Sequence, residues 1–324
     1  MTYADLVAIE HENWVAYLTG AVSCASGAIV TRAGGVVTIL TGLPFDWFNQ
    51  VLIEHAEATP AAVLAGVAQA LERGGRFVVR LREGIDDRFV PTLARAGLVS
   101  ASRDTLTPGM VAFPIDSDAI NAAAPPELEI RRVIDAAGID AHRSVVTAGF
   151  GSDPTVAQGT ACQGLLDRPE CVLYVGYAGG AAVVSGLGWR TGRTIGVYSI
   201  ATVEWARRHG YGAAMTARVL ADGLVVGCDV AAFQASEMGR SIYERLGFRT
   251  VVKYAAHPEA AGASQVETFP PSSTRSVGKM KPDSSRPGHS RQVRAGRCDD
   301  RRGDSTRRRG LAPRADRARC WLGP

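Results

Sequence analysis

The 324-residue sequence contains six cysteines, but no two of them stand in C-x-x-C spacing. Cys24, Cys162, Cys171 and Cys228 are scattered along the chain. Structural zinc sites and disulfide-rich scaffolds need closely and regularly spaced cysteines. We therefore expect no metal site and no disulfide framework, and the reducing cytosol is the simplest compartment.

The sequence also predicts neither a secretory leader nor a membrane-spanning segment. A signal peptide begins with cationic residues, whereas this N-terminus carries Asp5, Glu10 and Glu12. The segment 171–189 has no charged residue, but several glycines interrupt it. Two β-prone runs flank Ala178-Gly179-Gly180, which indicates a hairpin rather than a membrane helix. We expect a cytoplasmic protein without membrane contact.

The net charge of +4 hides an uneven distribution. Residues 262–324 contain 15 Lys and Arg against 6 Asp and Glu, which leaves a net charge of −5 for the rest of the chain. Few apolar residues remain there to offset the entropy of ordering, so 258–324 is predicted to be a disordered basic tail. Nucleic-acid binding is not expected, because no aromatic residue lies between Phe269 and Trp321 to stack on bases.

The rest of the chain repeats one order of elements. Periodicity predicts an amphipathic helix over 1–20, then strand 36–40, helix 60–73, strand 77–81, helix 86–96 and strand 110–115. A similar order recurs in 127–257, and Gly97-Leu98 stands 150 positions before Gly247-Phe248. We predict an α/β protein with an α+β mixed sheet, in which 1–115 is a degenerate copy of 127–257 and 116–126 is a linker. The alternative is that unrelated α/β units share this order.

The stretch 194–212, TIGVYSIATVEWARRHGYG, organises the second half. A β-prone run, 195–202, leads into a glycine-bearing turn and then a helix-prone run, 213–224. Such a turn directs backbone N–H groups and the positive end of the helix dipole at one point, where a pyrophosphate can bind. Gly210 and Gly212 would let the backbone approach the anion closely. Close packing at the helix start is the alternative explanation.

Two motifs in this half resemble the GCN5-related N-acetyltransferase (GNAT) superfamily. Residues 207–212, RRHGYG, match its acetyl-CoA signature Arg/Gln-x-x-Gly-x-Gly/Ala. Residues 243–248, YERLGF, match its Tyr-x-x-x-Gly-Phe pattern, one strand later. The resemblance covers 127–254 and implies a GNAT-like fold there. The first half lacks both motifs. At the same 150-residue offset, Leu93 takes the position of Tyr243.

The resemblance implies that acetyl-CoA, the expected cofactor, lies between two parallel strands that splay apart, here 195–202 and 228–236. It carries the cofactor contacts over to Ile200, Thr202, Arg207, Arg208, His209, Gly210, Tyr211, Gly212 and Ala213. Tyr243 is the implied catalytic acid, because a phenol can protonate the departing CoA thiolate. The alternative for Tyr243 is a half-buried aromatic packed on the sheet. The general base is not visible, since 195–202 holds no carboxylate.

The resemblance thus implies an N-acetyltransferase that moves acetyl from acetyl-CoA to an amine by direct attack. The expected partner is a small-molecule or peptide amine acceptor, and the sequence leaves open a homodimer. A second class is a silent CoA-binding sensor or interaction module, which the missing carboxylate favours. A third is a nucleic-acid binder that works through the basic tail.

Overall fold

The computed structural model describes residues 1–100, 106–120, 124–235 and 240–259, all within one structural unit. The helices in these ranges are α1 (Tyr3–Ala21), α2 (Pro60–Arg73), α3 (Val90–Arg95), α4 (Ser117–Ile120), α5 (Ala136–Phe150), α6 (Pro154–Gln158), α7 (Gln163–Leu166), α8 (Tyr211–Val225) and α9 (Arg240–Arg245). The strands are β1 (Ile29–Ala33), β2 (Val36–Leu40), β3 (Asn49–Ile53), β4 (Val78–Arg82), β5 (Thr107–Ala112), β6 (Glu129–Arg132), β7 (Cys171–Ala178), β8 (Ala181–Thr191), β9 (Thr194–Thr202), β10 (Val230–Gln234) and β11 (Arg249–His257).

Local sequence signals account for the starts of α1 and α2. The Thr2 side chain accepts from the backbone of Asp5 and completes a capping box at α1. Thr59 caps α2 with Pro60 in its first turn, as predicted. The segment 155–166 holds parts of two short helices, because α6 ends at Gln158 and α7 begins at Gln163. The linker 116–126 also contains a short helix, α4.

The described strands form one mixed sheet of eleven strands, in the order β1-β2-β3-β4-β11-β5-β10-β9-β8-β7-β6. The two ends of the sheet are built alike. An antiparallel pair, β2–β3, precedes the parallel pair β3–β4, and the antiparallel pair β8–β9 precedes the parallel pair β9–β10. The mixed α/β sheet predicted from the sequence is confirmed.

The closing strands of the two predicted domains are exchanged. β11, the last strand of 127–257, lies between β4 and β5, whereas β5, the last strand of 1–115, lies between β10 and β11. Each end of the sheet therefore takes a central strand from the other half of the sequence. Division of the chain at 115 and 127 stays a prediction, but neither segment contains all the strands of its own end.

The two motifs that stand 150 residues apart end their helices in the same way. After α9, Gly247 has a φ of 83° and the Phe248 N–H bonds to the Tyr243 carbonyl at 3.1 Å. After α3, Gly97 has a φ of 78° and the Leu98 N–H bonds to the Leu93 carbonyl at 3.0 Å. This is the glycine C-cap in which the residue after glycine closes the last turn.

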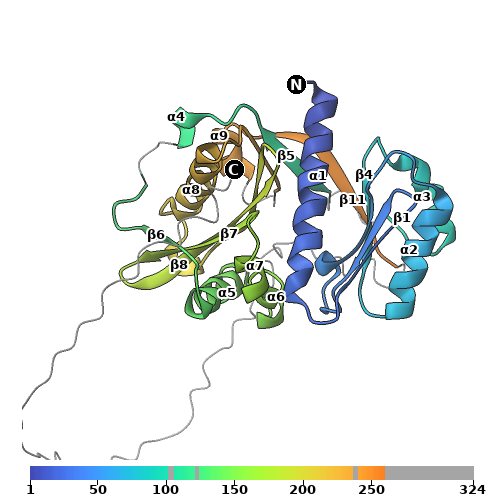
Figure 1. Cartoon of the computed structure of the whole chain (residues 1–324), viewed down its shortest axis with the longest axis horizontal. Coiled ribbons are helices and arrows are strands. Elements are labelled where there is room, and N and C mark those ends of the chain that lie inside the picture. The colour runs from blue at the N-terminus through green and yellow to red at the C-terminus, as the bar shows by residue number, and fades with distance from the viewer. Residues whose placement is uncertain (101–105, 121–123, 236–239, 260–324) are drawn as a thin grey trace, which may run out of the picture. The chain divides into compact units, whose positions relative to one another are not determined.

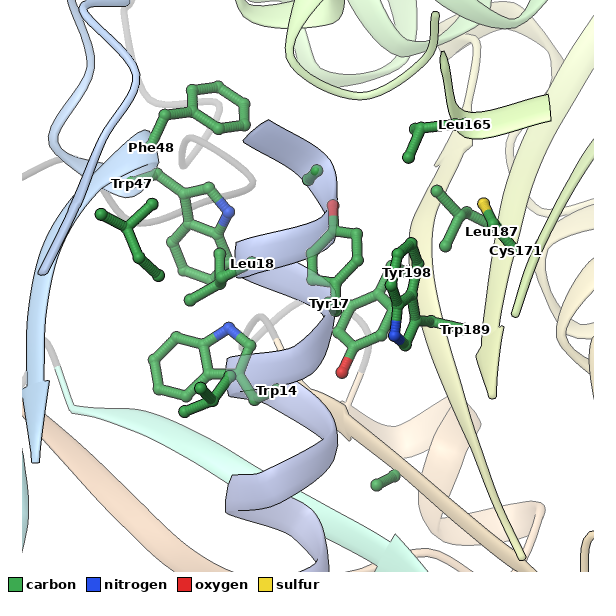
Figure 2. Close-up of a cluster of buried hydrophobic side chains, with 14 of the residues drawn as sticks. Trp14, Tyr17, Leu18, Trp47, Phe48, Leu165, Cys171, Leu187, Trp189 and Tyr198 are labelled. Atoms are coloured by element: carbon green, nitrogen blue, oxygen red, sulfur yellow. The ribbon is translucent and has the colours of Figure 1, made fainter. Parts of the chain in front are cut away.

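Helix α1 is buried on nearly every side, because it packs between the two ends of the sheet (Figure 1). Figure 2 shows Trp14 directed toward Trp47 and Tyr17 directed toward Tyr198 on the other side. The Trp14 and Trp47 ring centroids are 5.9 Å apart, and the Tyr17 and Tyr198 rings stack at 3.7 Å. α1 therefore joins the core of the first half to that of the second.

A disulfide corrects the expectation drawn from cysteine spacing. Cys24, in the 3₁₀ turn after α1, is bonded to Cys162, just before α7, with a Cα–Cα distance of 5.3 Å. Cys171 and Cys228 are buried free thiols. The spacing rule failed because the two cysteines, with a sequence separation of 138, are brought together by tertiary folding alone.

Candidate active site

β9 and β10 pair over only part of their length. Their parallel ladder ends at the pair Gly196–Ala232, although β9 continues to Thr202 and β10 to Gln234. Beyond that pair, the described residues of the two strands form no further ladder pair. The backbone groups that face this gap, here called the ladder opening, can bind an extended ligand arm as an added strand would.

A β-bulge at Ser199 bends β9 beside the ladder opening. The β8–β9 register shifts between Ser185 and Leu187, which pair with Ala201 and Tyr198. Ser199 has a φ of 52°, a left-handed conformation that costs a non-glycine residue roughly 1–3 kcal/mol. The buried Ser185 hydroxyl donates to the Ser199 carbonyl at 2.9 Å and holds the bulge in place. No pattern in the sequence predicted this bulge.

The bulge divides β9 between two faces of the sheet. Before it, the Tyr198 hydroxyl donates to Oδ1 of Asn13 on α1 at 2.7 Å. After it, Ile200 and Thr202 lie next to Gly212 at the start of α8. Helix α1 thus covers one face of the ladder opening, and α8 lies on the other (Figure 1).

The turn after β9 delivers the start of α8 to the end of that strand. Arg208 and Gly210 have positive φ values, 68° and 81°, and Gly210 is the N-cap of α8. Within the described residues, no side chain caps this helix. The first-turn N–H groups of Tyr211, Gly212 and Ala213 are therefore left for another acceptor, and the helix dipole favours an anion there.

Gly210 and Gly212 are glycines for different structural reasons. Gly210 is required by its left-handed φ, which other residues adopt only with strain. A Cβ on Gly212 would lie 3.5 Å from Oγ1 of Thr202, an ordinary van der Waals distance. Close packing therefore does not explain Gly212, whereas close approach of a ligand would.

The polar side chains of the turn bond mainly to the protein itself. Nη2 of Arg207 donates to the Gly149 carbonyl at 2.7 Å, so Arg207 ties the turn to the end of α5. The exposed His209 ring stacks on Tyr211, with centroids 5.5 Å apart. The Arg208 side chain is exposed. Arg207 thus shapes the turn, and Arg208 is the cation in the turn that remains at the surface.

The Tyr211 hydroxyl donates to Oε1 of Glu127 at 2.9 Å. Burial and the adjacent carboxylate both raise the pKa of Tyr211, whereas a backbone hydrogen bond and the Tyr211 hydroxyl lower the pKa of Glu127. Glu127 follows the predicted linker, and Pro125 within that linker lies beside Gly210. The start of the second half thus braces one side of the turn.

Tyr243 packs on the strand that forms the other edge of the ladder opening. Its ring lies 4.1 Å from the Phe233 ring of β10, measured between centroids, and 6.1 Å from that of Phe248. Burial raises the pKa of Tyr243 to about 12, so the phenol is protonated at neutral pH. Phe233 and Gln234 point to opposite faces of β10, and Gln234 contacts α1. Tyr243 therefore lies on the α8 face.

Sequence analysis missed a buried carboxyl group on α1. Glu10 was counted only as an acidic residue of the N-terminus, yet its exposed fraction is 0%. Leu6 and Trp14, one turn away on either side, are buried apolar residues of the same helix face. A carboxylate in the middle of an apolar stripe was the available signal.

The described residues contain no cluster of three or more His, Cys, Asp or Glu suited to a metal ion. Among them, no helix has both the length and the apolar character needed to cross a membrane. Of the tail predicted over 258–324, residues 260–324 lie outside the described residues. Glu259 forms an isolated β-bridge with Leu98.

No family model and no curated protein sequence matches this chain. Solved structures do. A GCN5-related N-acetyltransferase from Kribbella flavida superposes with a TM-score of 0.59 at 17% identity, covering 78% of this chain and 95% of that one. The chain has the GNAT fold. Two further GNAT structures agree: one from Sphaerobacter thermophilus (TM-score 0.50, 14% identity, 70% and 81% covered) and a tandem GNAT protein of the clavulanic acid biosynthesis pathway (0.53, 11%, 72% and 83%). The fold predicted from the two motifs is confirmed.

Proposed function

We propose that this protein transfers an acetyl group from acetyl-CoA to an amine by direct attack on the thioester. One observation carries the proposal: the β9–β10 ladder ends at Gly196–Ala232, beside a bulged strand that leads to an uncapped helix start. The opening offers unpaired backbone to the pantetheine arm, and the helix start offers N–H groups to the pyrophosphate.

The proposed cofactor contacts follow from this arrangement. The pyrophosphate would accept hydrogen bonds from the first-turn N–H groups of Tyr211, Gly212 and Ala213, with Arg208 nearby as an exposed cation. Ile200 and Thr202 line the α8 face of the opening, where the pantetheine arm would lie. A backbone N–H of the bulged strand would polarise the thioester carbonyl as it becomes an oxyanion.

Tyr243 is the proposed proton donor for the departing CoA sulfur. Its packing against β10 on the α8 face, the side on which the cofactor would bind, supports this role. The acceptor is an amine of a small molecule or a peptide. Direct attack needs no covalent enzyme intermediate.

The cofactor site is tested by Gly212→Asp, which would add a side chain and a negative charge where the pyrophosphate is proposed to bind. Calorimetry should show acetyl-CoA binding weakened at least ~10-fold. Gly192→Asp is the matched control: it adds the same charge in an open turn with a φ of 55°, at the opposite end of β9. Unchanged affinity in folded Gly212→Asp would remove the phosphate-site assignment.

The activity is tested by release of free thiol from acetyl-CoA against a panel of amines. Thiol release with at least one amine, together with an acetylated product, is the expected result. A protein that binds acetyl-CoA tightly but releases thiol with none of them would be a CoA-binding sensor instead.

A further inference from the structure

Glu10 is a fully buried carboxyl group that reaches from α1 to the strands of the second half. Nε2 of Gln234 donates to its Oε1 at 2.6 Å, and the Tyr254 hydroxyl lies 2.5 Å from its Oε2. A Cβ on Gly109 of β5 would overlap the carboxyl group, so the neighbouring strand leaves room for it. The surrounding backbone is thus built around this side chain.

The geometry around Glu10 provides partners for a shared proton among Glu10, Tyr254 and His11. Nε2 of His11 lies 2.7 Å from the Ile53 carbonyl, which can only accept, so Nε2 carries a hydrogen. Nδ1 of His11 lies 3.0 Å from the Tyr254 hydroxyl. The Tyr254 hydroxyl donates to Glu10 when that carboxyl group is ionised. When Glu10 is protonated, it can donate to the hydroxyl oxygen, and the hydroxyl can then donate to Nδ1 of neutral His11. Every member has a partner only when Glu10 is protonated or when that proton has moved to His11.

Burial raises the pKa of Glu10 to about 7 and lowers that of His11 to about 3, so the proton resides on Glu10. The charged or titratable groups that face Glu10 are His11 on its own helix, Arg82 at the end of β4, Tyr198 on β9 and Tyr254 on β11. Arg82 and the hydrogen bonds from Tyr254 and Gln234 only partly offset the effect of burial. Glu10 therefore changes its charge near neutral pH.

Glu10 reaches the edge of the ladder opening through Gln234 of β10, and its carboxyl group lies over Gly109 of the adjacent strand β5. Tyr198 and Gln234 each stand two residues beyond the last paired residues, Gly196 and Ala232, and on the same strand face as those residues. Gln234 bonds directly to Glu10. The carboxyl group is thus held on the α1 face of the sheet, one strand from the opening and opposite the face on which Tyr243 packs.

We propose that Glu10 is the general base of the acetyl transfer, supplied by the N-terminal helix to the edge of the opening in the other half of the sheet. This inference rests on the proposed function and names the base that the motif-bearing strand lacks. It also gives the first half, which has neither acetyl-CoA motif, a chemical role.

The step balances with the groups present. The amine nitrogen attacks the thioester carbon and forms the C–N bond while ionised Glu10 takes the nitrogen's proton. The C–S bond then breaks, and the CoA sulfur receives a proton through Tyr243. Protonation of Glu10 restores the complete hydrogen-bond network with Tyr254 and His11, which makes the buried carboxylate a stronger base than a solvated one.

The decisive variant is Glu10→Gln, because a glutamine amide reproduces protonated Glu10. Its NH₂ group can donate to Tyr254 and its oxygen can accept from Gln234, so the fold should be kept. The control is Glu12→Gln, the same change at an exposed position two residues along α1. Wild type and both variants are compared by single-turnover thiol release over about pH 5.5 to 9, with one amine whose own ionisation is common to all three.

Wild type and Glu12→Gln should show the same dependence of the thiol-release rate on pH. At about pH 8, Glu10→Gln should be slower by ~10²- to 10⁴-fold, and the ratio of wild-type to variant rate should fall tenfold per pH unit below about pH 7. Acetyl-CoA affinity should stay within about twofold. A folded Glu10→Gln protein with the wild-type rate and profile would overturn the assignment.

A second variant keeps the test decisive if Glu10→Gln does not fold. Tyr254→Phe removes a hydrogen bond that favours ionised Glu10. The loss of rate at low pH should therefore begin at a higher pH in this variant than in wild type. If Tyr254→Phe shows the same dependence of rate on pH as wild type, the proposal is contradicted. A wild type that binds acetyl-CoA yet acetylates nothing contradicts the proposed function and this inference together, whereas an active wild type with an equally active Glu10→Gln contradicts the inference alone.

Discussion

Replacing Tyr243 with phenylalanine removes one hydroxyl and preserves the packing around it. The phenylalanine ring would keep the contacts with Phe233 at 4.1 Å and with Phe248 at 6.1 Å between centroids. The Tyr243 hydroxyl forms no hydrogen bond with another described residue, so its loss leaves no partner unsatisfied among them. We therefore expect the melting temperature and the acetyl-CoA affinity of Tyr243→Phe to match wild type.

The size of the rate loss follows from the pKa of about 12 that burial gives Tyr243. A thiol has a pKa of about 8.5, so complete transfer of the phenol proton to the thiolate is unfavourable by roughly 5 kcal/mol. Tyr243 therefore helps mainly by donating a hydrogen bond to the sulfur as charge develops on it. A hydrogen bond to a charged group contributes about 1.5–3 kcal/mol, which corresponds to a rate loss of roughly 10- to 100-fold.

Single-turnover kinetics is the appropriate assay, because slow product release would mask a loss in the chemical step. Thiol release from enzyme-bound acetyl-CoA should be slower in Tyr243→Phe by the stated factor. If the folded variant reacts at the wild-type rate while chemistry is limiting, Tyr243 is only an aromatic packed on β10.

Three further outcomes are expected. Calorimetry should give one acetyl-CoA per chain, because the first half lacks the pyrophosphate motif; two sites would contradict this. Cys24→Ser should destabilise the fold by at most ~5 kcal/mol, which is the chain-entropy value for a loop closed across a separation of 138 residues. A reductant should lower the melting temperature of wild type but not that of the variant. A chain ending at Glu259 should bind acetyl-CoA as wild type does, since every proposed contact precedes that residue; weakened binding would give the basic tail a part in the site.

The sequence predicted the elements that local patterns encode. The GNAT motif at 243–248 was recognisable because the glycine C-cap needs a glycine at Gly247, and the following Phe248 closes the helix. The same cap at Gly97 explains why the first half looked like a copy of the second. Thr59 and Pro60 marked the start of α2 for equally local reasons. Such signals lie within a few residues of the structure they determine.

Features set by tertiary contacts were not predictable in this way. β1 and β3 were missed, and the bulge at Ser199 depends on a hydrogen bond from Ser185 on the neighbouring strand. The disulfide joins cysteines that approach each other only after folding. Exchange of β5 and β11 between the ends of the sheet leaves no trace in the periodicity of either strand, because the alternation of buried and exposed residues reports the faces of a strand and not the strands beside it.

This exchange explains why a degenerate first half would be retained. β10, one edge of the ladder opening, pairs on its other side with β5 of the first half, and β4 pairs with β11 of the second. Removing 1–115 would therefore expose the free edge of β10 and remove α1 from the opposite face of the opening. The second half would lose both the support of its candidate site and the buried carboxyl group of Glu10. A front half without motifs can thus be indispensable to the chemistry of the other half.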